Sequence, residues 1–172
     1  MSLVDSEVDH EFLVMLDLVD MEIEHLEMAL DRIDMTTFDA FHFDQILNDA
    51  SLPFLVYKIF QFHNLFKFAN INLESLVTFT KEMAQGYFKE NPFHNVMHIL
   101  DSLQGLHFVI KAPNIKKNLK RQDQLSAFIA CLMHDFEHPG YSNQFVIRTK
   151  HPLAIRYSDQ CVLENHHLAA AF

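Results

Sequence analysis

Apolar residues recur every three or four positions along most of the chain, which is the spacing of amphipathic helices. Over residues 4–33 they share one face and acidic residues fill most of the other side, so this segment is predicted to form a single helix. The same spacing predicts a helix beginning at Pro53, helices over residues 73–88 and 93–110, and a strongly apolar helix over residues 123–137. No segment shows the strict alternation of a strand. The predicted fold is therefore all-α, a compact array of helices.

Turn and cap residues separate these helices. Residues 36–51 contain many of them and are predicted to form a connector, and an Asn-Pro pair at 91–92 and a Pro-Gly pair at 139–140 interrupt the helical pattern further on. Two or three shorter helices are expected after that point. The last of them, residues 162–172, has no Gly, Pro or basic last turn, so we expect the domain to be interrupted there.

The negative charge of the chain is concentrated at one end. The formal net charge is −10, and residues 1–35 hold eleven acidic residues and one basic residue, whereas residues 36–172 hold twelve of each. No basic nucleic-acid surface is predicted, so we expect no nucleic-acid partner. The apolar stripe of residues 4–33 has two interpretations. It packs on its own domain, or it forms a coiled-coil-like arm that binds a partner helix; parallel pairing with a second copy is disfavoured because the acidic faces repel each other.

Composition also indicates the compartment. No uninterrupted apolar run reaches the roughly 18 residues of a membrane span, so no span is predicted. Acidic residues begin at Asp5 without a basic segment before an apolar stretch, which is unlike a signal peptide. The two cysteines, Cys131 and Cys161, have no C-x-x-C spacing. A reducing compartment is the simpler interpretation, and we expect a cytoplasmic protein.

Histidine is the residue type that points to chemistry, since eight of the twelve histidines follow position 93. On a helix, His94, His98 and Asp101 at i, i+4 and i+7 would share one stripe. His134 and Asp135 end the most apolar helix and are expected to be buried at its tip. Burying such groups is costly unless a partner satisfies them. Imidazole and carboxylate ligands from separate helices suit Zn²⁺, and an aspartate can bridge to a second, harder ion such as Mg²⁺.

Two further groups extend this pattern, His138 just before the Pro-Gly pair and the run Glu164-Asn165-His166-His167. An isolated H-x-x-x-H or His-Asp pair is common by chance, and the run at 164–167 alone is compatible with a solvated start of a helix. Taken jointly, in this order and at these spacings, the three clusters predict a metal site.

Three segments carry a sequence signature. Residues 91–101 resemble the pattern N-P-Y-H-N-x-x-H-A-x-D, residues 134–145 resemble H-D-x-x-H-P-G-x-x-N-x-F, and residues 153–167 resemble L-A-x-x-Y-N-D-x-S-V-L-E-N-H-H. These are motifs of the class I 3′,5′-cyclic-nucleotide phosphodiesterases, a branch of the His-Asp (HD) metal-dependent phosphohydrolases. The similarity runs from about residue 52 to residue 172.

The resemblance implies a multi-helix fold of the HD superfamily and hydrolysis of cyclic AMP or cyclic GMP to 5′-nucleoside monophosphates in signal transduction. It implies two divalent cations, Zn²⁺ and Mg²⁺ (or Mn²⁺). It also assigns roles to residues. His94 would protonate the leaving O3′; His98, His134 and Asp135 would bind the first cation, with Asp135 bridging to the second; and His138 and Glu164 would order water around the second cation.

The chain departs from the family pattern in two local positions and in extent. Phe93 replaces a tyrosine and Ser158 an asparagine. The resemblance implies that the family supplies a further aspartate ligand, a purine-binding glutamine and a hydrophobic clamp after the last matched motif. We therefore divide the chain into an acidic helix, residues 1–35, and an incomplete catalytic portion, residues 36–172, and expect it to be weakly active or inactive.

Two alternatives to this interpretation stay open. The first is a natural, non-catalytic short form that acts as a helical interaction module for a complete phosphodiesterase, pairing through residues 4–33. The second is hydrolysis of another phosphate ester on the same metal frame.

Overall fold

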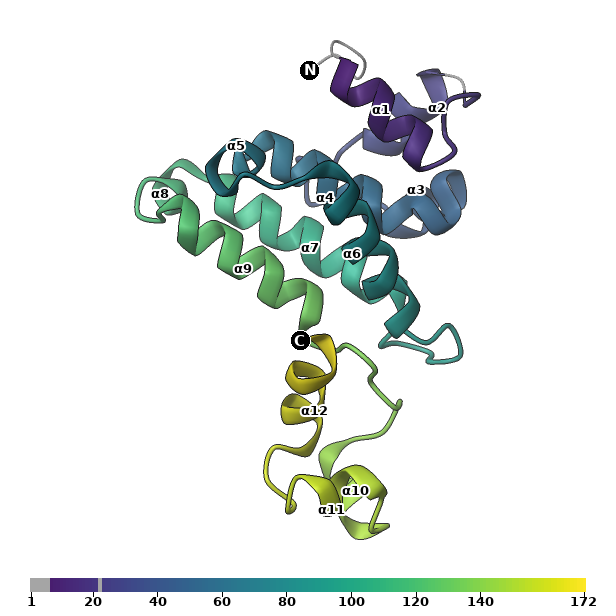
Figure 1. The fold of residues 1–172 in the computed structure, drawn as a ribbon, viewed down its shortest axis with the longest axis vertical. Helices are drawn as coiled ribbons and strands as arrows, with labels where there is room; N and C mark the ends of the chain where they lie inside the picture. Colours follow the sequence, from purple (N-terminus) through teal and green to yellow (C-terminus); the bar gives the residue numbers. More distant parts are fainter. Residues whose placement is uncertain (1–6, 22) are drawn as a thin grey trace.

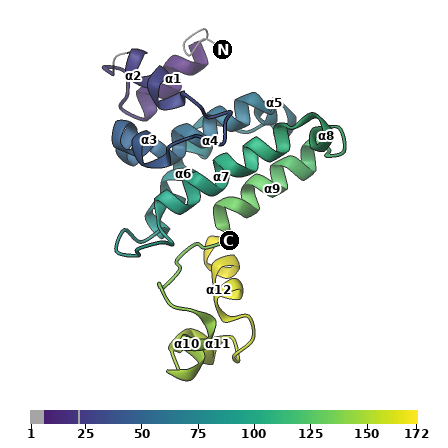
Figure 2. The same ribbon diagram turned by 180° about the vertical axis from the view of Figure 1, so that it is seen from behind.

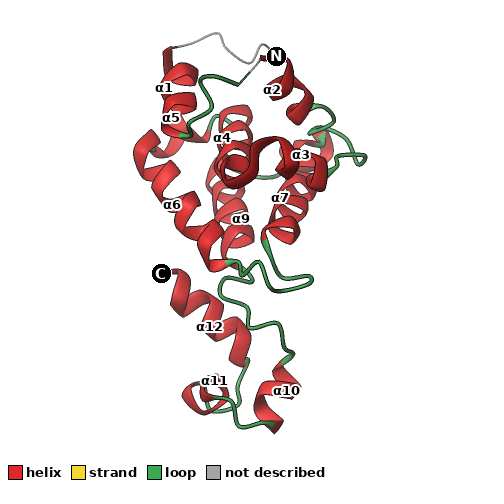
Figure 3. Ribbon diagram, turned by 90° about the vertical axis from the view of Figure 1, so that its right-hand side faces the viewer, coloured by secondary structure: helices red, strands yellow, loops and turns green. Residues whose placement is uncertain are grey.

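The computed structural model describes residues 7–21 and 23–172, and in these residues it consists of helices and loops without a strand (Figure 1, Figure 3). This confirms the all-α prediction for the described part of the chain. The elements are α1 Glu7–Met15, α2 Ile23–Leu30, α3 Ala40–Leu47, the 3₁₀ turn η1 Asn48–Ala50, α4 Ser51–Phe62, α5 Leu65–Ala69, α6 Leu73–Gly86, α7 Val96–Lys111, α8 Pro113–Lys116, α9 Arg121–Met133, α10 Asn143–Arg148, α11 Pro152–Arg156 and α12 Val162–Ala171.

Helix α4 lies at the centre of the fold. Each of its first seven residues, 51–57, is buried, as expected of a helix that is apolar on all sides. Helices α6 and α7 pack against α4, and α9 packs against α7; the view from behind shows α7 and α9 side by side (Figure 2). This bundle fixes the ends of α6, α7 and α9, where the histidine clusters lie.

The N-terminal segment forms two helices, α1 and α2, so the prediction of a single helix over residues 4–33 is wrong in this respect. Helix α1 ends in a Schellman motif: Leu18 N–H donates to Leu13 O at 2.9 Å and Asp17 N–H donates to Val14 O at 3.1 Å. Asp17 occupies the left-handed position of this motif, with φ of 59°. The predicted stripe residue Val4 lies outside the described residues.

Residues 36–51 also differ from the prediction, because this segment contains α3 and η1 rather than a simple connector. The Asp39 carboxylate caps α3 by accepting hydrogen bonds from the N–H groups of Phe41 and His42, each at 3.0 Å. The turn and cap residues that suggested a connector therefore mark the start of a helix.

Apolar contacts attach the N-terminal segment to the bundle. Phe12 is buried and its ring stacks on Tyr57 of α4, with the centroids 3.8 Å apart. Polar side chains of α7 hold the end of the segment, since Gln104 Nε2 donates to the carbonyl oxygens of Ile33 and Met35, each at 2.8 Å. Most of the described stripe thus packs on its own domain, although Val19 is exposed. Binding of a partner helix through residues 4–33 stays a prediction.

A chain of polar side chains, buried at Gln124, His63 and His107 and exposed at Asp34, crosses the bundle. His63 Nδ1 lies 3.0 Å from Gln124 Oε1, and His63 Nε2 lies 3.1 Å from His107 Nδ1. His107 Nε2 lies 3.0 Å from Asp34 Oδ1, which also accepts a hydrogen bond from Lys111 at 2.7 Å. The chain therefore links α9, the end of α4, α7 and the N-terminal segment.

We expect the free energy of unfolding to fall as the pH falls from about 6.5 to 4. Burial, with the neighbouring His107 charge, lowers the pKa of His63 to about 4. Below pH 6.5 the unfolded chain therefore binds a proton that the folded chain does not bind until about pH 4, and each pH unit costs up to about 1.4 kcal/mol per proton. Urea unfolding at several pH values measures this slope. His63→Gln should reduce it and the exposed His42→Gln should not; equal slopes in the three proteins would contradict the prediction.

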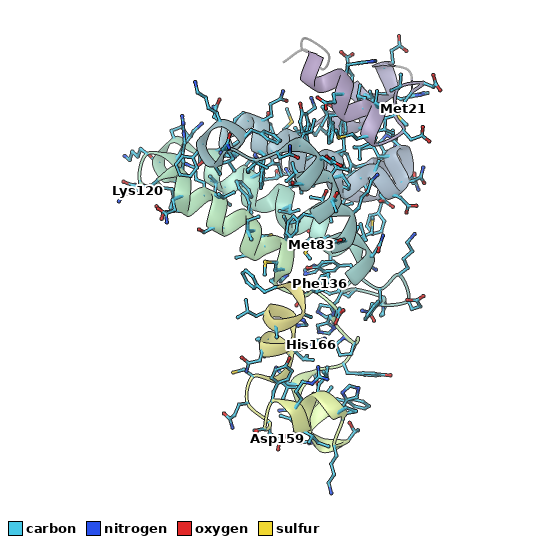
Figure 4. The ribbon with its side chains drawn as sticks, viewed as in Figure 1. Met21, Met83, Lys120, Phe136, Asp159 and His166 are labelled. Carbon is cyan, nitrogen blue, oxygen red and sulfur yellow. The ribbon has the colours of Figure 1, made fainter. Side chains whose placement is uncertain are left out.

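Helices α10, α11 and α12 form an arm that extends from the end of the bundle (Figure 1). The arm has an apolar cluster of its own, made by Val146, Ala154, Val162 and Leu163. Figure 4 shows Phe136 where the end of α9 meets α12, and His166 further along the arm. The arm therefore brings α12 to the same end of the bundle as α7 and α9.

Ser158, one of the two local departures from the family pattern, has a backbone role. It lies in the left-handed region with φ of 53°, where its N–H donates to Ile155 O at 3.3 Å and the next N–H, of Asp159, donates to Ala154 O at 2.9 Å. This Schellman motif ends α11. Asparagine adopts this conformation more readily than serine, so the departure affects a helix end.

Among the described residues, no helix combines the length and apolar character needed to cross a membrane.

Candidate metal centre

The histidine clusters meet around Asp135, at the end of the bundle from which the arm extends. His98 comes from the first turn of α7, and His134 and Asp135 form the turn after α9. His94 and His138 come from the loops that precede α7 and follow α9. Segments that are distant in the sequence thus converge on one carboxylate.

Backbone and side-chain hydrogen bonds fix the two helix ends that carry these groups. The Asn95 side chain caps α7 by accepting from Met97 N–H at 3.0 Å. The buried Tyr87 hydroxyl donates to Leu132 O at 2.9 Å and accepts from Asp135 N–H at 3.4 Å. Glu137 N–H donates to Gly86 O at 2.9 Å, which ties the turn after α9 to the end of α6.

The closest group consists of three side chains. His98 Nε2 lies 3.1 Å and His134 Nε2 lies 3.2 Å from Asp135 Oδ2, and the two Nε2 atoms are 3.1 Å apart. His98, His134 and Asp135 are the residues that the sequence predicted to bind the first cation. The structure brings all three together, with ligand atoms close enough to hold one ion.

The tautomer of His134 favours a cation among these three side chains. His134 Nδ1 lies 2.7 Å from Cys131 O, and only an N–H can donate to a carbonyl, so the neutral ring has a lone pair at Nε2. That lone pair is directed at a carboxylate oxygen and at a second imidazole nitrogen. Such a contact needs a proton or a metal ion, and a histidine held by a carbonyl through its other nitrogen is typical of metal ligands. The three residues therefore fit a divalent cation.

The charges in this group agree with that assignment. Partial burial alone would raise the pKa of Asp135, but the hydrogen bond from His134 and the nearby imidazoles outweigh it and hold the pKa at about 2. Burial and the His134 charge lower the pKa of His98. At neutral pH the site thus offers the ionised carboxylate of Asp135 and the neutral imidazole of His98, the forms that bind metal ions. The hydrogen bond from its Nε2–H to Asp135 raises the pKa of His134, so a bound cation would take the place of that Nε2 proton.

His94 and His138 form a second pair beside Asp135. Their rings stack with centroids 3.7 Å apart and an interplanar angle of 15°. His138 Nδ1 accepts a hydrogen bond from Gly140 N–H at 3.0 Å, so in the neutral ring the proton is at Nε2. Burial and the His94 charge lower the pKa of His138 to about 4, so the neutral ring dominates at pH 7. Although His94, Asp135 and His138 are also close enough to hold an ion, this tautomer of His138 offers no lone pair to it.

Two expectations about this site were wrong. Helix α7 begins at Val96, so His94 lies in the preceding loop and does not share a helical stripe with His98. His94 Nε2 nevertheless lies 3.9 Å from Asp135 Oδ2. His134 was expected to be buried at the tip of α9, but α9 ends at Met133 and the His134 side chain, in the turn that follows, is 39% exposed.

The third cluster lies on α12, and the role predicted for its Glu164, ordering water around a second cation, stays a prediction. Glu164 is exposed, and both of its carboxylate oxygens accept hydrogen bonds from the Asn143 side chain, at 3.0 and 3.1 Å. Its placement ties α12 to α10. His167, to which the sequence analysis gave no role, is buried with Nε2 3.8 Å from Asp135 Oδ1 and Nδ1 2.7 Å from Phe136 O. Its position one turn after Glu164 on α12 was the signal that could have identified it.

A hollow of about 510 Å³ adjoins the group on the side of His98. It is lined by residues 37–41, which precede and begin α3, and by Phe93, Met97, His98 and Asp101. Phe93 is exposed and its ring centroid lies 4.7 Å from that of His98. The centre therefore opens onto a surface that is partly aromatic and partly acidic.

Comparison with known families agrees with the motifs. The model of the family described as 3′5′-cyclic nucleotide phosphodiesterase matches residues 93–172. This segment contains His94, His98, His134 and Asp135. The part of the chain that forms the centre is thus the part that the family model recognises.

Curated relatives match over a longer range. The mouse dual specificity calcium/calmodulin-dependent 3′,5′-cyclic nucleotide phosphodiesterase 1C is 34% identical over 145 residues, which are 84% of this chain and 20% of the relative. The probable 3′,5′-cyclic-AMP phosphodiesterase pde-4 of Caenorhabditis elegans is 34% identical over 86% of the chain and 22% of the relative. Mouse 3′,5′-cyclic-AMP phosphodiesterase 4C is 33% identical over 87% of the chain and 22% of the relative. The chain thus spans about a fifth of the length of these relatives.

Proposed function

This chain belongs to the 3′,5′-cyclic nucleotide phosphodiesterase family, and we propose that the protein carrying it hydrolyses 3′,5′-cyclic nucleotides to 5′-nucleoside monophosphates with the help of divalent cations. The observation that carries the proposal is the convergence of His98, His134 and Asp135, with His94 Nε2 3.9 Å from the same carboxylate oxygen. Two of the relatives are named for cyclic AMP and one is named as a dual specificity cyclic nucleotide phosphodiesterase, so cyclic AMP and cyclic GMP are both kept as candidate substrates.

His98, His134 and Asp135 hold the first cation in this proposal. The acceptor atoms that meet there, and the lone pair of His134 directed into the group, support the assignment. Zinc suits the two nitrogens, and magnesium or manganese suits a second position beside the Asp135 carboxylate. Bound cations would polarise the phosphoryl oxygens and activate water.

His94 supplies the proton for the leaving group. Water attacks phosphorus and releases one proton to the solvent, the P–O3′ bond breaks, and the imidazolium of His94 donates its Nε2 proton to O3′, because an alkoxide leaves poorly unless it is protonated. His138 stacks beneath His94 and keeps its own proton at Nε2, where it is available to orient water. Glu164 acts through Asn143 in the placement of α12.

Residues 1–172 alone are weakly active or inactive in this account. The group is open to water on the side of His134, whose side chain is 39% exposed. Electrostatic stabilisation of a phosphoryl group is weak where water has such access.

We also propose a cytoplasmic location, which the two free cysteines support.

The test assays the longest natural form of the protein with cyclic AMP, cyclic GMP and p-nitrophenyl phosphate, with Mg²⁺ or Mn²⁺ and after EDTA. We expect one or both cyclic nucleotides to yield the 5′-monophosphate, EDTA to stop the reaction, and added cation to restore it. His94→Gln should lower kcat by about 10²- to 10⁴-fold. His25→Gln, an exposed histidine on α2, should not.

Two results would contradict the proposal. Failure to hydrolyse either cyclic nucleotide under all cation conditions would exclude the activity. Full activity on p-nitrophenyl phosphate with none on the cyclic nucleotides would indicate a different phosphate ester as substrate.

A further inference from the structure

Asn91 lies between the two loops that carry His94 and His138. It is buried, with 9% of its surface exposed, and follows the end of α6. Its Nδ2 group donates one hydrogen bond to His94 O at 3.0 Å and one to His138 O at 2.7 Å. Both protons of a single amide therefore connect backbone positions that are 44 residues apart in the sequence.

The backbone and the other side-chain atom of Asn91 are also held in place. Asn91 O accepts a hydrogen bond from the side chain of Asn95, the cap of α7, at 2.7 Å. Its Oδ1 lies 2.6 Å from the position that a Cβ atom on Gly140 would occupy. Gly140 has φ of 80°, and its N–H donates to His138 Nδ1. Asn91 thus contacts both sides of the turn that sets the tautomer of His138.

We propose that Asn91 is a positioning residue for cyclic-nucleotide hydrolysis: its two N–H donors hold the loop of His94 against the loop of His138, and this keeps the two rings stacked with Nε2 of His94 near Asp135. The inference rests on the proposed function and goes beyond it, because the amide contacts neither a ligand atom of the cation group nor the stacked rings themselves. It acts only through the backbone carbonyls of the two histidines.

Asparagine is suited to this position for a definite reason. The two acceptors are carbonyl oxygens, so the side chain between them must present two protons, and an aspartate would place a carboxylate oxygen against a carbonyl oxygen. Serine has one proton to donate and is shorter. Asn91→Asp therefore removes both donors with little change of shape, and Asn91→Ser leaves one donor at most.

The test combines kinetics with a spectroscopic reading of the histidine pair in the longest natural form of the protein. In Asn91→Asp we expect kcat for the preferred cyclic nucleotide to fall about 10- to 100-fold, the effect of losing a supporting contact of this kind. KM should stay within about threefold. The ¹H–¹⁵N imidazole signals of His94 should lose the shift that stacking on His138 causes, while those of the buried His63 and His107 stay in place.

Two further measurements distinguish a positioning role of Asn91 from a general destabilisation of the fold. Zn²⁺ affinity should change little, because His98, His134 and Asp135 make no contact with the Asn91 amide in the hydrogen bonds described. The control is Asn118→Asp, since Asn118 also donates its amide to a carbonyl, Asn114 O at 2.8 Å, but lies on the surface after α8. It carries the same change of charge and should leave kcat and the His94 signals unaltered. Asn91→Ser should give an intermediate loss.

Two outcomes would overturn the inference, and a third would overturn the proposed function on which it rests. Unchanged kcat with unchanged His94 signals in Asn91→Asp would show that the two hydrogen bonds do not position the ring. Loss of the helical circular dichroism in both Asn91 variants would make Asn91 a residue of the fold alone. A wild-type protein without hydrolytic activity would remove the proposed function itself, whereas the His94 signals would still report whether the amide holds the stacked pair.

Discussion

Replacing Asp135 with Asn should abolish measurable cyclic-nucleotide hydrolysis, a loss of about 10³-fold or more. Asp135 is the carboxylate shared by the candidate cation group and by the His94 pair. A cation supplies several kcal/mol of transition-state stabilisation, and about 1.4 kcal/mol corresponds to a tenfold change in rate. An amide cannot replace an ionised carboxylate whose pKa is held at about 2. Initial rates with the longest natural form of the protein measure the effect.

Asp101→Asn is the matched control for this variant. Asp101 lies on α7 about one turn after His98, is exposed, and lines the hollow beside the centre without belonging to either possible cation group. It should retain most of the activity. If Asp135→Asn kept activity within about tenfold of the wild type, or if Asp101→Asn lost as much, the placement of the cations around Asp135 would be wrong.

Replacing Gly86 with Ala should destabilise the fold by about 1–3 kcal/mol, because a Cβ at this buried position overlaps the ring of Phe136. Phe136 lies in the turn between Asp135 and Glu137, and Gly86 O accepts the N–H of Glu137. Displacing the ring therefore also displaces the candidate centre. The variant should unfold at lower urea concentration and bind Zn²⁺ more weakly.

Gly105→Ala is the matched substitution, and it should change the free energy of unfolding in the opposite direction. Gly105 lies within α7, and a Cβ there meets no atom within 4 Å. Alanine is the better helix former by about 0.5–1 kcal/mol, so this variant should be slightly more stable than the wild type. Adding Phe136→Leu to Gly86→Ala should restore part of the lost stability. Equal unfolding midpoints for Gly86→Ala and Gly105→Ala would contradict the packing described.

The helices of the bundle were the part of the fold best predicted from the sequence. Helices α6, α7 and α9 follow apolar spacing that is visible without tertiary information, since each buries one face over three or more turns. The break after α1 was not predicted, because the sequence has Asp17 where a helix-ending glycine would be the usual signal. The turn at Asp17 is favoured only by the burial of Leu13 and Leu18, which lie on either side of it.

The candidate site was predicted in composition more closely than in geometry. The types, order and spacing of the residues predicted a metal site, the resemblance to the family assigned three of them to the first cation, and the structure brings these three together. The stacking of His94 on His138 was not predicted, because it depends on two loops whose separation in sequence carries no information about their contact. The role of Asn91 was not predicted either, because it depends on the backbone carbonyls of His94 and His138, which lie in the same two loops. Side-chain identity predicts ligands well, whereas loop contacts require the fold.

The most direct test of this account is the position of a bound cation. Crystals of the protein grown or soaked with Zn²⁺ should give an anomalous difference peak about 2.0–2.2 Å from His98 Nε2, His134 Nε2 and an Asp135 carboxylate oxygen, the distances typical of zinc. The peak should be absent from Asp135→Asn and present in Asp101→Asn. A wild-type protein without a peak among these three residues, or with its only strong peak elsewhere, would contradict the central claim that they form a divalent cation site.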